Sequence, residues 1–271
     1  QVDSSSAVEA RLPGRLDEAM AGDKLRRRPR VRALDCEMVG VGDRGRKSVL
    51  IRISVVGRRG KVLLDCLVRP DHEVTDWRTH ITGIDAGCFS GSTSENLETA
   101  LSRPALPSLV LSNEEAVRQA NALLDGSVIV GHDLRHDLKL LHRFHQRRIL
   151  LRDTAFCPLL REGLRRSAPG GPPSLRALVD AWLVDDCTSF RGNGASAHDS
   201  VEDARRAMLL YRIIAPEWEA YAQRKWGPLP VEVLEASKAK GQRVRPSSSG
   251  ARLASRSERR LRLLSGRGSG R

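Results

Sequence analysis

Three strand-like runs lie close together near the start of the chain, and they limit the folds that this sequence can adopt. They cover Val31–Asp35, Val49–Val56 and Lys61–Val68, and Gly57-Arg-Arg-Gly60 between the last two has the composition of a hairpin turn. Farther along, segments with helical and strand patterns alternate. Three consecutive strands followed by such alternation predict an α/β fold, a mixed β-sheet flanked by helices.

The alternating part begins after residues 86–112, which are rich in Ser, Gly and Pro and are expected to form a long loop or insertion. Short strands are expected at Val128–Val130 and Ile149–Leu151. Hydrophobic spacing and N-cap residues such as Ser174 predict four helices: Glu114–Leu124, Leu134–Phe144, one from Ser174 to Leu183, and one from about Ser200 that Pro216 ends or kinks. The last of these helices is expected to bury one stripe of residues: Val201, Ala204, Met208 and Tyr211.

Charge divides the chain into three parts. The net charge is +13, of which the first 32 residues contribute +3 and Lys238–Arg271 contribute +10, so the centre is neutral. We therefore expect a basic segment at 1–30, a folded domain at 31–226 and a basic, disordered tail at 227–271. Basic flanks around a neutral centre indicate a polyanionic partner, with inert solubilising tails as the alternative. No segment approaches the roughly 20 apolar residues of a membrane span, so no membrane partner is expected.

A pair of acids closes the first expected strand. Asp35 and Glu37 are two residues apart, so their carboxylates project from the same face of an extended strand. Two divalent ions about 3.5–4 Å apart need such a cluster of oxygen ligands. Pairs of this kind also occur by chance, but Leu34, Cys36 and Met38 make these surroundings apolar, unlike those of a solvated strand end.

A second acidic group stands where an expected strand opens into a helix, the place where α/β sheets hold their chemistry. In Val130-Gly-His-Asp-Leu-Arg-His-Asp137, Asp133 and Asp137 are one helical turn apart, so either could face the metal ions. Asp133 could instead serve only the helix dipole. The region also holds four histidines, which raise the alternative of a zinc site: His132, His136, His142 and His145. They scatter around the expected helix, whereas zinc needs ligands that converge on one point.

The third group is His198-Asp-Ser-Val-Glu-Asp203. Asp203 falls in the first turn of the last helix, and His198 lies in the loop before it. A histidine near metal-bound carboxylates can take a proton from the attacking water because its pKa lies near neutrality. A lone histidine ahead of a helix is usually a surface residue, but the order of the preceding acids favours a catalytic role here.

Together, three segments resemble the exonuclease motifs of the DEDDh nucleases: Leu34-Asp-Cys-Glu-Met-Val-Gly40, Val130-Gly-His-Asp-Leu-Arg-His-Asp-Leu138 and His198-Asp-Ser-Val-Glu-Asp-Ala204. The Asp-Cys-Glu-Met-Val form is similar to the branch that contains RNA exonuclease 4 and the interferon-stimulated exonuclease. The similarity covers about residues 31–215. Further matches are Asp76-Trp-Arg-Thr79 with Thr82-Gly-Ile84, Arg152-Asp-Thr154 and Pro173-Ser-Leu175. Two departures from the family pattern are the length of residues 87–112 and His80, where relatives often carry Arg.

The resemblance implies an RNase H-like fold and hydrolysis of nucleic acid from the 3′ end, with release of nucleoside 5′-monophosphates. It implies that His198 is the general base, and it favours Asp137 over Asp133. The residues that would hold two Mg²⁺ or Mn²⁺ ions are Asp35, Glu37, Asp137 and Asp203. By the same similarity, the substrate-binding residues would be Met38, Arg78, Gly83 and Ile84.

We therefore expect a 3′→5′ exonuclease of single-stranded RNA that acts in the nucleus or nucleolus, with ribosomal RNA precursors as a candidate substrate. The first alternative is the same chemistry on DNA, as in repair or apoptotic degradation. A non-catalytic RNA-binding factor in ribosome assembly is the second, and the complete set of five catalytic residues counts against it. A glycoside hydrolase would use neither His198 nor four acids. The sequence identifies no protein partner.

The basic tail gives a first prediction. Its residues can neutralise phosphates and so release counterions, and Lys238–Arg245 also has the composition of a nuclear address. Ending the chain after Ser237 should leave turnover of saturating short substrates unchanged and weaken binding to long RNA. The slope of log affinity against log salt should become shallower by roughly 0.7 for each phosphate that the tail would otherwise neutralise. An inert tail would leave both the slope and the cellular location unchanged.

Overall fold

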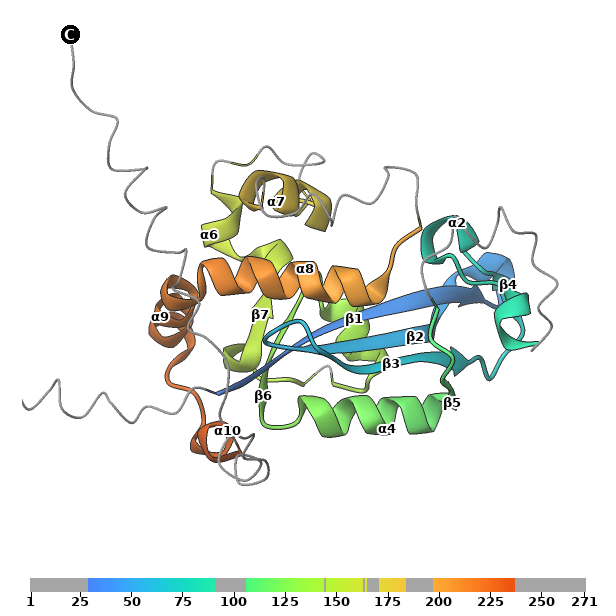
Figure 1. Ribbon diagram of the computed structural model, residues 1–271, viewed down its shortest axis with the longest axis horizontal. Coiled ribbons are helices and arrows are strands. Elements are labelled where there is room, and N and C mark those ends of the chain that lie inside the picture. The colour runs from blue at the N-terminus through green and yellow to red at the C-terminus, as the bar shows by residue number, and fades with distance from the viewer. Residues whose placement is uncertain are drawn as a thin grey trace, which may run out of the picture. The chain divides into compact units, whose positions relative to one another are not determined.

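A mixed seven-stranded sheet forms the centre of the computed structural model, which describes residues 29–90, 106–143, 145–162, 164, 171–183 and 197–236 (Figure 1). The strand order is β5-β3-β2-β1-β6-β7, and β4 pairs with β1 outside this path. The bounds are β1 Arg30–Val41, β2 Lys47–Gly57, β3 Val62–Arg69, β4 Val74–Asp76, β5 Val110–Ser112, β6 Ser127–Gly131 and β7 Leu151–Asp153. The expected α/β class with a mixed sheet is confirmed.

The first three strands form an antiparallel meander, to which β5, β6 and β7 add in parallel and β4 adds in antiparallel fashion. β1 pairs with β2 and β2 with β3 in antiparallel fashion, whereas β6 lies parallel to β1 and β7 parallel to β6. The predicted turn between β2 and β3 is present, because Gly60 N–H donates to the Gly57 carbonyl over 2.8 Å. Between β1 and β2 the register shifts after Glu37, so that Glu37 faces Arg52 and Met38 faces Leu50. Such an irregularity bends a strand and re-aims its side chains, and this one adjoins the second acid of β1.

Helices cover both faces of the sheet (Figure 1). On one face, α4 (Asn113–Leu124) and α5 (Arg135–Leu140) pack their leucines and alanines against residues such as Leu34, Ile53 and Cys66. On the other, α8 (Ser200–Ile213), α7 (Leu175–Trp182) and α9 (Ala215–Trp226) pack against Val31 and Ala33. Alternation along β1 therefore buries Leu34 toward α4 and places Asp35 on the face that carries α8.

The structure contains the expected helices, and the predicted cap, buried stripe and proline position are observed. Ser174 Oγ accepts a hydrogen bond from Ala177 N–H at 3.2 Å, as an N-cap residue does. The four residues predicted to face the core from the last helix are all buried: Val201, Ala204, Met208 and Tyr211. Pro216 lies in the first turn of α9, directly after α8 ends at Ile213, which is a position that proline favours.

Four boundaries differ from the prediction. The first strand, expected to end at Asp35, continues to Val41, so Asp35 and Glu37 lie in its middle and not at its end. The helix expected to run to Phe144 ends at Leu140, and His142 follows with a φ of 54°, a left-handed conformation that no helix continues through. Phe144 itself lies outside the described residues. The strand expected at Ile149–Leu151 begins only at Leu151, because Arg148–Leu150 form the short 3₁₀ helix η4. Within 86–112, residues 86–89 form the 3₁₀ helix η3 and residues 110–112 form β5, whereas 91–105 lie outside the described residues.

The start of the expected tail is also ordered, which corrects the domain boundary at residue 226. Helix α10 (Val231–Ala236) buries Val233 against Ile149, Leu150 and Ala222. The sequence did not indicate α10, because this helix has only about two turns and follows the helix-breaking Pro228 and Pro230. Residues 237–271 and 1–28 lie outside the described part of the chain.

The remaining short elements are η2 (Asp43–Gly45), α2 (Thr79–Thr82), η5 (Thr154–Phe156) and α6 (Pro158–Arg161). None of the described helices has the length and apolar character needed to cross a bilayer.

Candidate active site

The two acids of β1 lie on the face of the sheet that α8 covers. Asp35 faces Ser54 of β2 in the strand register and Glu37 faces Arg52. Glu37 is 6% exposed, and its Oε1 is a buried oxygen without a hydrogen-bond partner among the described residues. A buried carboxylate oxygen left without a donor is unfavourable unless a cation approaches it.

Asp137 reaches these acids from the first turns of α5. It is 4% exposed, and its carboxyl group interacts with the thiol of Cys36, which stands between Asp35 and Glu37 on β1. Asp133, the alternative candidate, points elsewhere: its carboxylate accepts a hydrogen bond from Arg135 Nε at 2.9 Å. Its φ of 53° lies in the left-handed region that Asp tolerates better than most residues. The geometry thus agrees with the choice of Asp137.

Asp153 at the end of β7 holds the turn that leads into α5. Its carboxylate accepts hydrogen bonds from the backbone N–H groups of Asp133, Leu134 and Ala155, over 2.9, 3.0 and 3.1 Å. The turn is tight, because a Cβ at Gly131 would lie 2.2 Å from Leu134 Cδ2. Asp153 therefore fixes the position from which Asp137 points at β1, and this explains the Asp of the Arg152-Asp-Thr154 motif.

His198 and Asp203 enter from the start of α8. His198 Nδ1 lies 3.2 Å from Asp203 Oδ2, and the His198 side chain is 64% exposed. Its backbone N–H donates to the carbonyl of Ile81 in α2 over 2.6 Å. Asp203 is buried, and its other oxygen accepts a hydrogen bond from Arg206 Nη1 at 2.7 Å. His198 thus presents an accessible imidazole beside a buried carboxylate.

Burial and mutual repulsion raise the pKa values of three of the acids, Asp35, Glu37 and Asp137. Burial and then the neighbouring charges of Asp137, Asp203 and Glu37 raise the pKa of Asp35 well above its usual value. Burial raises the pKa of Glu37 to about 7, although the nearby His198 opposes the shift. Burial likewise raises the pKa of Asp137, against a hydrogen bond from the Cys36 thiol. The hydrogen bond to Asp203 raises the pKa of His198. All five predicted catalytic residues therefore interact electrostatically around the middle of β1.

The donor set of this cluster suits a hard divalent cation. Four carboxylates and no thiolate are the ligands that Mg²⁺ and Mn²⁺ prefer, and each bound cation would relieve the mutual repulsion. Within the described residues, no three His, Cys, Asp or Glu side chains already converge tightly enough to form a preformed metal-binding group, zinc sites at the histidines included. The carboxylates would thus have to draw together around an ion. The fit rests on the chemistry of the donors and on the orphaned oxygen of Glu37.

The residues expected to contact substrate lie around α2 and β1, in different environments. Met38 is half-buried, and the Arg78 guanidinium donates to Ser48 Oγ at 3.0 Å and to the Gly45 carbonyl at 3.1 Å. Gly83 ends α2 with a φ of 69°, which only glycine adopts freely. The Ile84 side chain is fully buried beside Val39. Its backbone N–H donates to Thr82 Oγ1 and its carbonyl accepts from Thr79 Oγ1.

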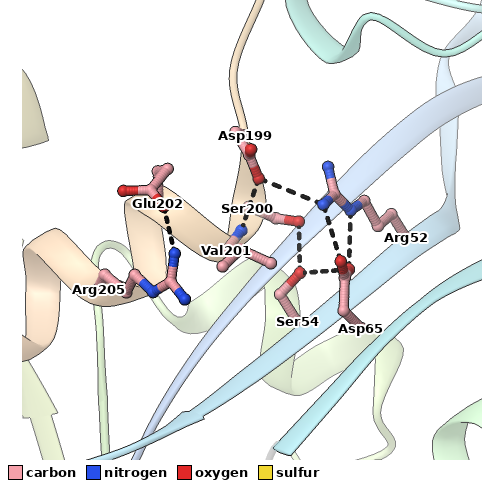
Figure 2. Close-up of polar contacts among 8 residues, drawn as sticks. All are labelled: Arg52, Ser54, Asp65, Asp199, Ser200, Val201, Glu202 and Arg205. Atoms are coloured by element: carbon pink, nitrogen blue, oxygen red, sulfur yellow. Dashed lines mark hydrogen bonds and ion pairs between the residues drawn. The ribbon is translucent and has the colours of Figure 1, made fainter. Parts of the chain in front are cut away.

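Sequence reasoning missed a polar network on the same face, formed by Arg52, Ser54, Asp65, Asp199 and Ser200 (Figure 2). A signal was present in Arg52, a charged residue in the middle of the apolar run Val49–Val56. Arginine is almost never fully buried unless it is paired, so a buried strand with an internal arginine indicates partners on adjacent elements. The sequence could not say which acids those are.

Known proteins of similar sequence identify the family to which these motifs belong. RNA exonuclease 4 of Kluyveromyces lactis is 34% identical over 230 residues, which cover 84% of this chain and 69% of that protein. RNA exonuclease 4 of Debaryomyces hansenii is 35% identical over 187 residues, 69% of this chain and 58% of that protein. The chain belongs to the RNA exonuclease 4 family. The predicted exonuclease branch and enzyme class are thereby confirmed, although the chain spans less than two thirds of the second relative.

Solved structures support the same fold. The catalytic unit of Neurospora crassa Pan2, with its protease and nuclease domain, superposes with a TM-score of 0.51 at 22% identity and covers 81% of this chain and 32% of that one. The Saccharomyces cerevisiae Pan2 pseudoubiquitin hydrolase–RNA exonuclease module in complex with AACCAA RNA gives 0.53 at 22% identity, covering 83% and 34%. At this identity the likeness shows the fold, the expected RNase H-like arrangement. No protein-family model matches this member of the RNA exonuclease 4 family.

The raised pKa of Glu37 predicts a pH dependence of stability. The folded protein keeps the Glu37 proton up to about pH 7, whereas the unfolded chain loses it near 4.5. The folded state therefore binds more protons in this range, and Glu37 makes the metal-free protein less stable as pH rises from about 4.5 to 7. At pH 8 the free energy of unfolding of Glu37→Gln should therefore exceed that of the wild type by roughly 1–3 kcal/mol. Urea unfolding of both proteins, in the presence of a chelator and between about pH 4.5 and 8, measures this difference. If it stayed constant across the pH range, the titration of Glu37 would not be its cause.

Proposed function

We propose that this chain is a metal-dependent 3′→5′ exonuclease that hydrolyses single-stranded RNA to nucleoside 5′-monophosphates. The observation that carries the proposal is a cluster at the middle of β1, to which three separate elements contribute: Asp35, Glu37, Asp137, Asp203 and His198. RNA is the proposed substrate because the relatives of this chain are RNA exonucleases. DNA is the competing outcome, and the 2′-hydroxyl is the group that a site could use to separate the two.

The four carboxylates would hold two Mg²⁺ or Mn²⁺ ions, which when bound would stabilise the charge on the attacking and leaving oxygens of the phosphodiester. His198 would accept the proton of the attacking water. With Nδ1 protonated and donating to Asp203, its Nε2 carries the lone pair that can take this proton. The Asp203 carboxylate also orients the ring and stabilises the imidazolium that forms.

Access to the site and the charge of the flanks support the remaining parts of the proposal. A single strand with a free 3′ end can bring its terminal phosphodiester to carboxylates that are largely buried, whereas a duplex end is blunt and wide. Met38 and Arg78, beside the acids and α2, would contact the terminal nucleotide. We further propose a nuclear or nucleolar location with ribosomal RNA precursors as substrate, on the basis of the net +10 charge of Lys238–Arg271.

Asp137 and Asp133 offer a matched pair for testing this function. Asp137→Asn removes a buried charge from the acidic cluster and should lower the rate of Mg²⁺-dependent RNA degradation by more than about 100-fold. Asp133→Asn breaks only an exposed ion pair with Arg135, so its rate should stay within about fivefold of wild type. End-labelled single-stranded RNA and DNA of the same sequence, with Mg²⁺ or chelator, measure both variants. An equal loss of rate in the two variants would contradict the role of Asp137 as a metal ligand. Faster cleavage of DNA than of RNA would make DNA the substrate.

His198 predicts a pH dependence of the rate. Because the hydrogen bond to Asp203 raises its pKa, His198 is protonated at low pH and becomes a base as pH rises. The rate should therefore increase with pH, and His198→Ala should lose roughly 10²–10⁴-fold in rate while it still binds metal. Single-turnover rates across pH test this for both proteins. An unchanged profile in the variant would mean that the water loses its proton without help from His198.

A further inference from the structure

Arg52 is a fully buried charge at the centre of a network that joins three elements (Figure 2). From β2 its Nε donates to Asp65 Oδ1 at 2.9 Å and its Nη2 to Asp65 Oδ2 at 3.0 Å, a two-pronged bond to β3. The same Nη2 lies 3.3 Å from Asp199 Oδ1, at the start of α8. The hydrogen bonds to Asp65 and the nearby acids keep the pKa of Arg52 above its usual value in spite of burial.

A second connection runs beside the first. Ser54, also on β2, donates to Asp65 Oδ1 at 3.0 Å, and its Oγ lies 2.7 Å from Ser200 Oγ. Asp199 is the N-cap of α8, since its carboxylate accepts the Val201 N–H at 3.0 Å. Two consecutive residues at the start of α8 are therefore each tied to the sheet, one through Arg52 and one through Ser54.

These two tethers lie between the groups that the proposed chemistry needs. His198 directly precedes Asp199, and Asp203 follows one turn later, with its N–H donating to the Asp199 carbonyl at 2.8 Å. Across the sheet, Arg52 faces Glu37 and Ser54 faces Asp35 in the strand register. The network thus couples the two halves of the acidic cluster, and three of its members lie outside the family motifs: Arg52, Ser54 and Asp65.

We propose that Arg52 is a positioning residue that holds the start of α8, through Asp199, so that His198 and Asp203 stay aligned with Asp35 and Glu37. This inference rests on the proposed function of the site. A displacement of about 1 Å in a catalytic group can cost on the order of 100-fold in rate, so a tether at this place acts on turnover more than on substrate binding. Arg52 also faces the acids as a counter-charge, and the experiment separates the two roles.

Arg152 provides the matched control. It too is fully buried and bonds a carboxylate with two nitrogens, Nε to Glu219 Oε1 at 2.9 Å and Nη2 to Oε2 at 2.6 Å. However, it links β7 to α9, away from the start of α8. A loss of stability common to buried arginines will appear in both variants, and a positioning effect only in Arg52.

The first test compares Arg52→Lys with Arg152→Lys in the full-length protein on short single-stranded RNA. Lysine keeps the positive charge near the acids but cannot bond Asp65 with two nitrogens while it reaches Asp199. Arg52→Lys should lower kcat by about 10- to 100-fold with KM within about threefold, while Arg152→Lys lowers the melting temperature and leaves kcat within about twofold. Wild-type kcat in Arg52→Lys, with folding intact, would reduce Arg52 to a counter-charge and overturn the proposal.

Asp199→Asn is the milder second variant, because asparagine still caps a helix but loses the ion pair with Arg52. If Arg52 acts through Asp199, the two substitutions remove the same tether, and the double variant should be scarcely slower than the worse single one. If the fold loss of rate in the double variant equalled the product of the two single losses, Arg52 and Asp199 would act independently, which would contradict the proposal.

Hydrogen–deuterium exchange tests the tether without any activity. In the chelator-treated protein, Arg52→Lys should speed exchange in peptides that cover residues 199–204, and Arg152→Lys should not. Equal protection of this segment in wild type and Arg52→Lys would overturn the proposal. If the wild-type protein degrades no RNA, the proposed function fails, and the exchange result still decides whether Arg52 positions α8.

Discussion

Four carboxyl groups from three elements share one region at the middle of β1, and three of them, Glu37, Asp137 and Asp203, are buried. Burial, and then the neighbouring negative charges, raise the pKa values of Asp35, Glu37 and Asp137, and this crowding weakens the folded state unless a cation joins the acids. The fold must supply the free energy that keeps them together. It does so with two apolar layers, one on each face of the sheet, and with polar anchors at each place where an acid enters.

Each anchor acts on the backbone next to an acid. Asp153 accepts three backbone N–H groups and thereby fixes the turn ahead of Asp137. Asp199 and Ser200 tie the start of α8 to β2, between His198 and Asp203. His198 is also held from α2, through the carbonyl of Ile81. The family motifs therefore contain both the reacting groups and some of the residues that aim them, and Arg52 adds an anchor that lies outside those motifs.

The parts of the fold that depend on local pattern could be predicted from the sequence. The hairpin at Gly57–Gly60 and the cap at Ser174 follow from turn and capping chemistry, and α8 follows from a regular apolar stripe. The five candidate catalytic residues came from motif order, which fixes neighbours in space only because the family fold is known.

The features that the sequence did not predict depend on tertiary contacts. Helix α10 is too short to form alone and exists because Val233 packs on Ile149 and Leu150. The Arg52 network joins residues up to 146 positions apart, and no local signal pairs Arg52 with Asp65 and Asp199. The burial of the Ile84 side chain against Val39 also depends on tertiary packing, and the sequence did not indicate it.

The central claim is that the acids of β1, α5 and α8 act together as one metal-binding group. The most direct measurement is calorimetric titration of the full-length protein with Mn²⁺, in wild type, Asp35→Asn and the exposed control Asp43→Asn, with the bound ions counted by electron paramagnetic resonance. The account predicts two Mn²⁺ ions per chain in wild type and in Asp43→Asn, and weaker or incomplete binding in Asp35→Asn. No binding in wild type, or the same stoichiometry and affinity in all three proteins, would contradict it.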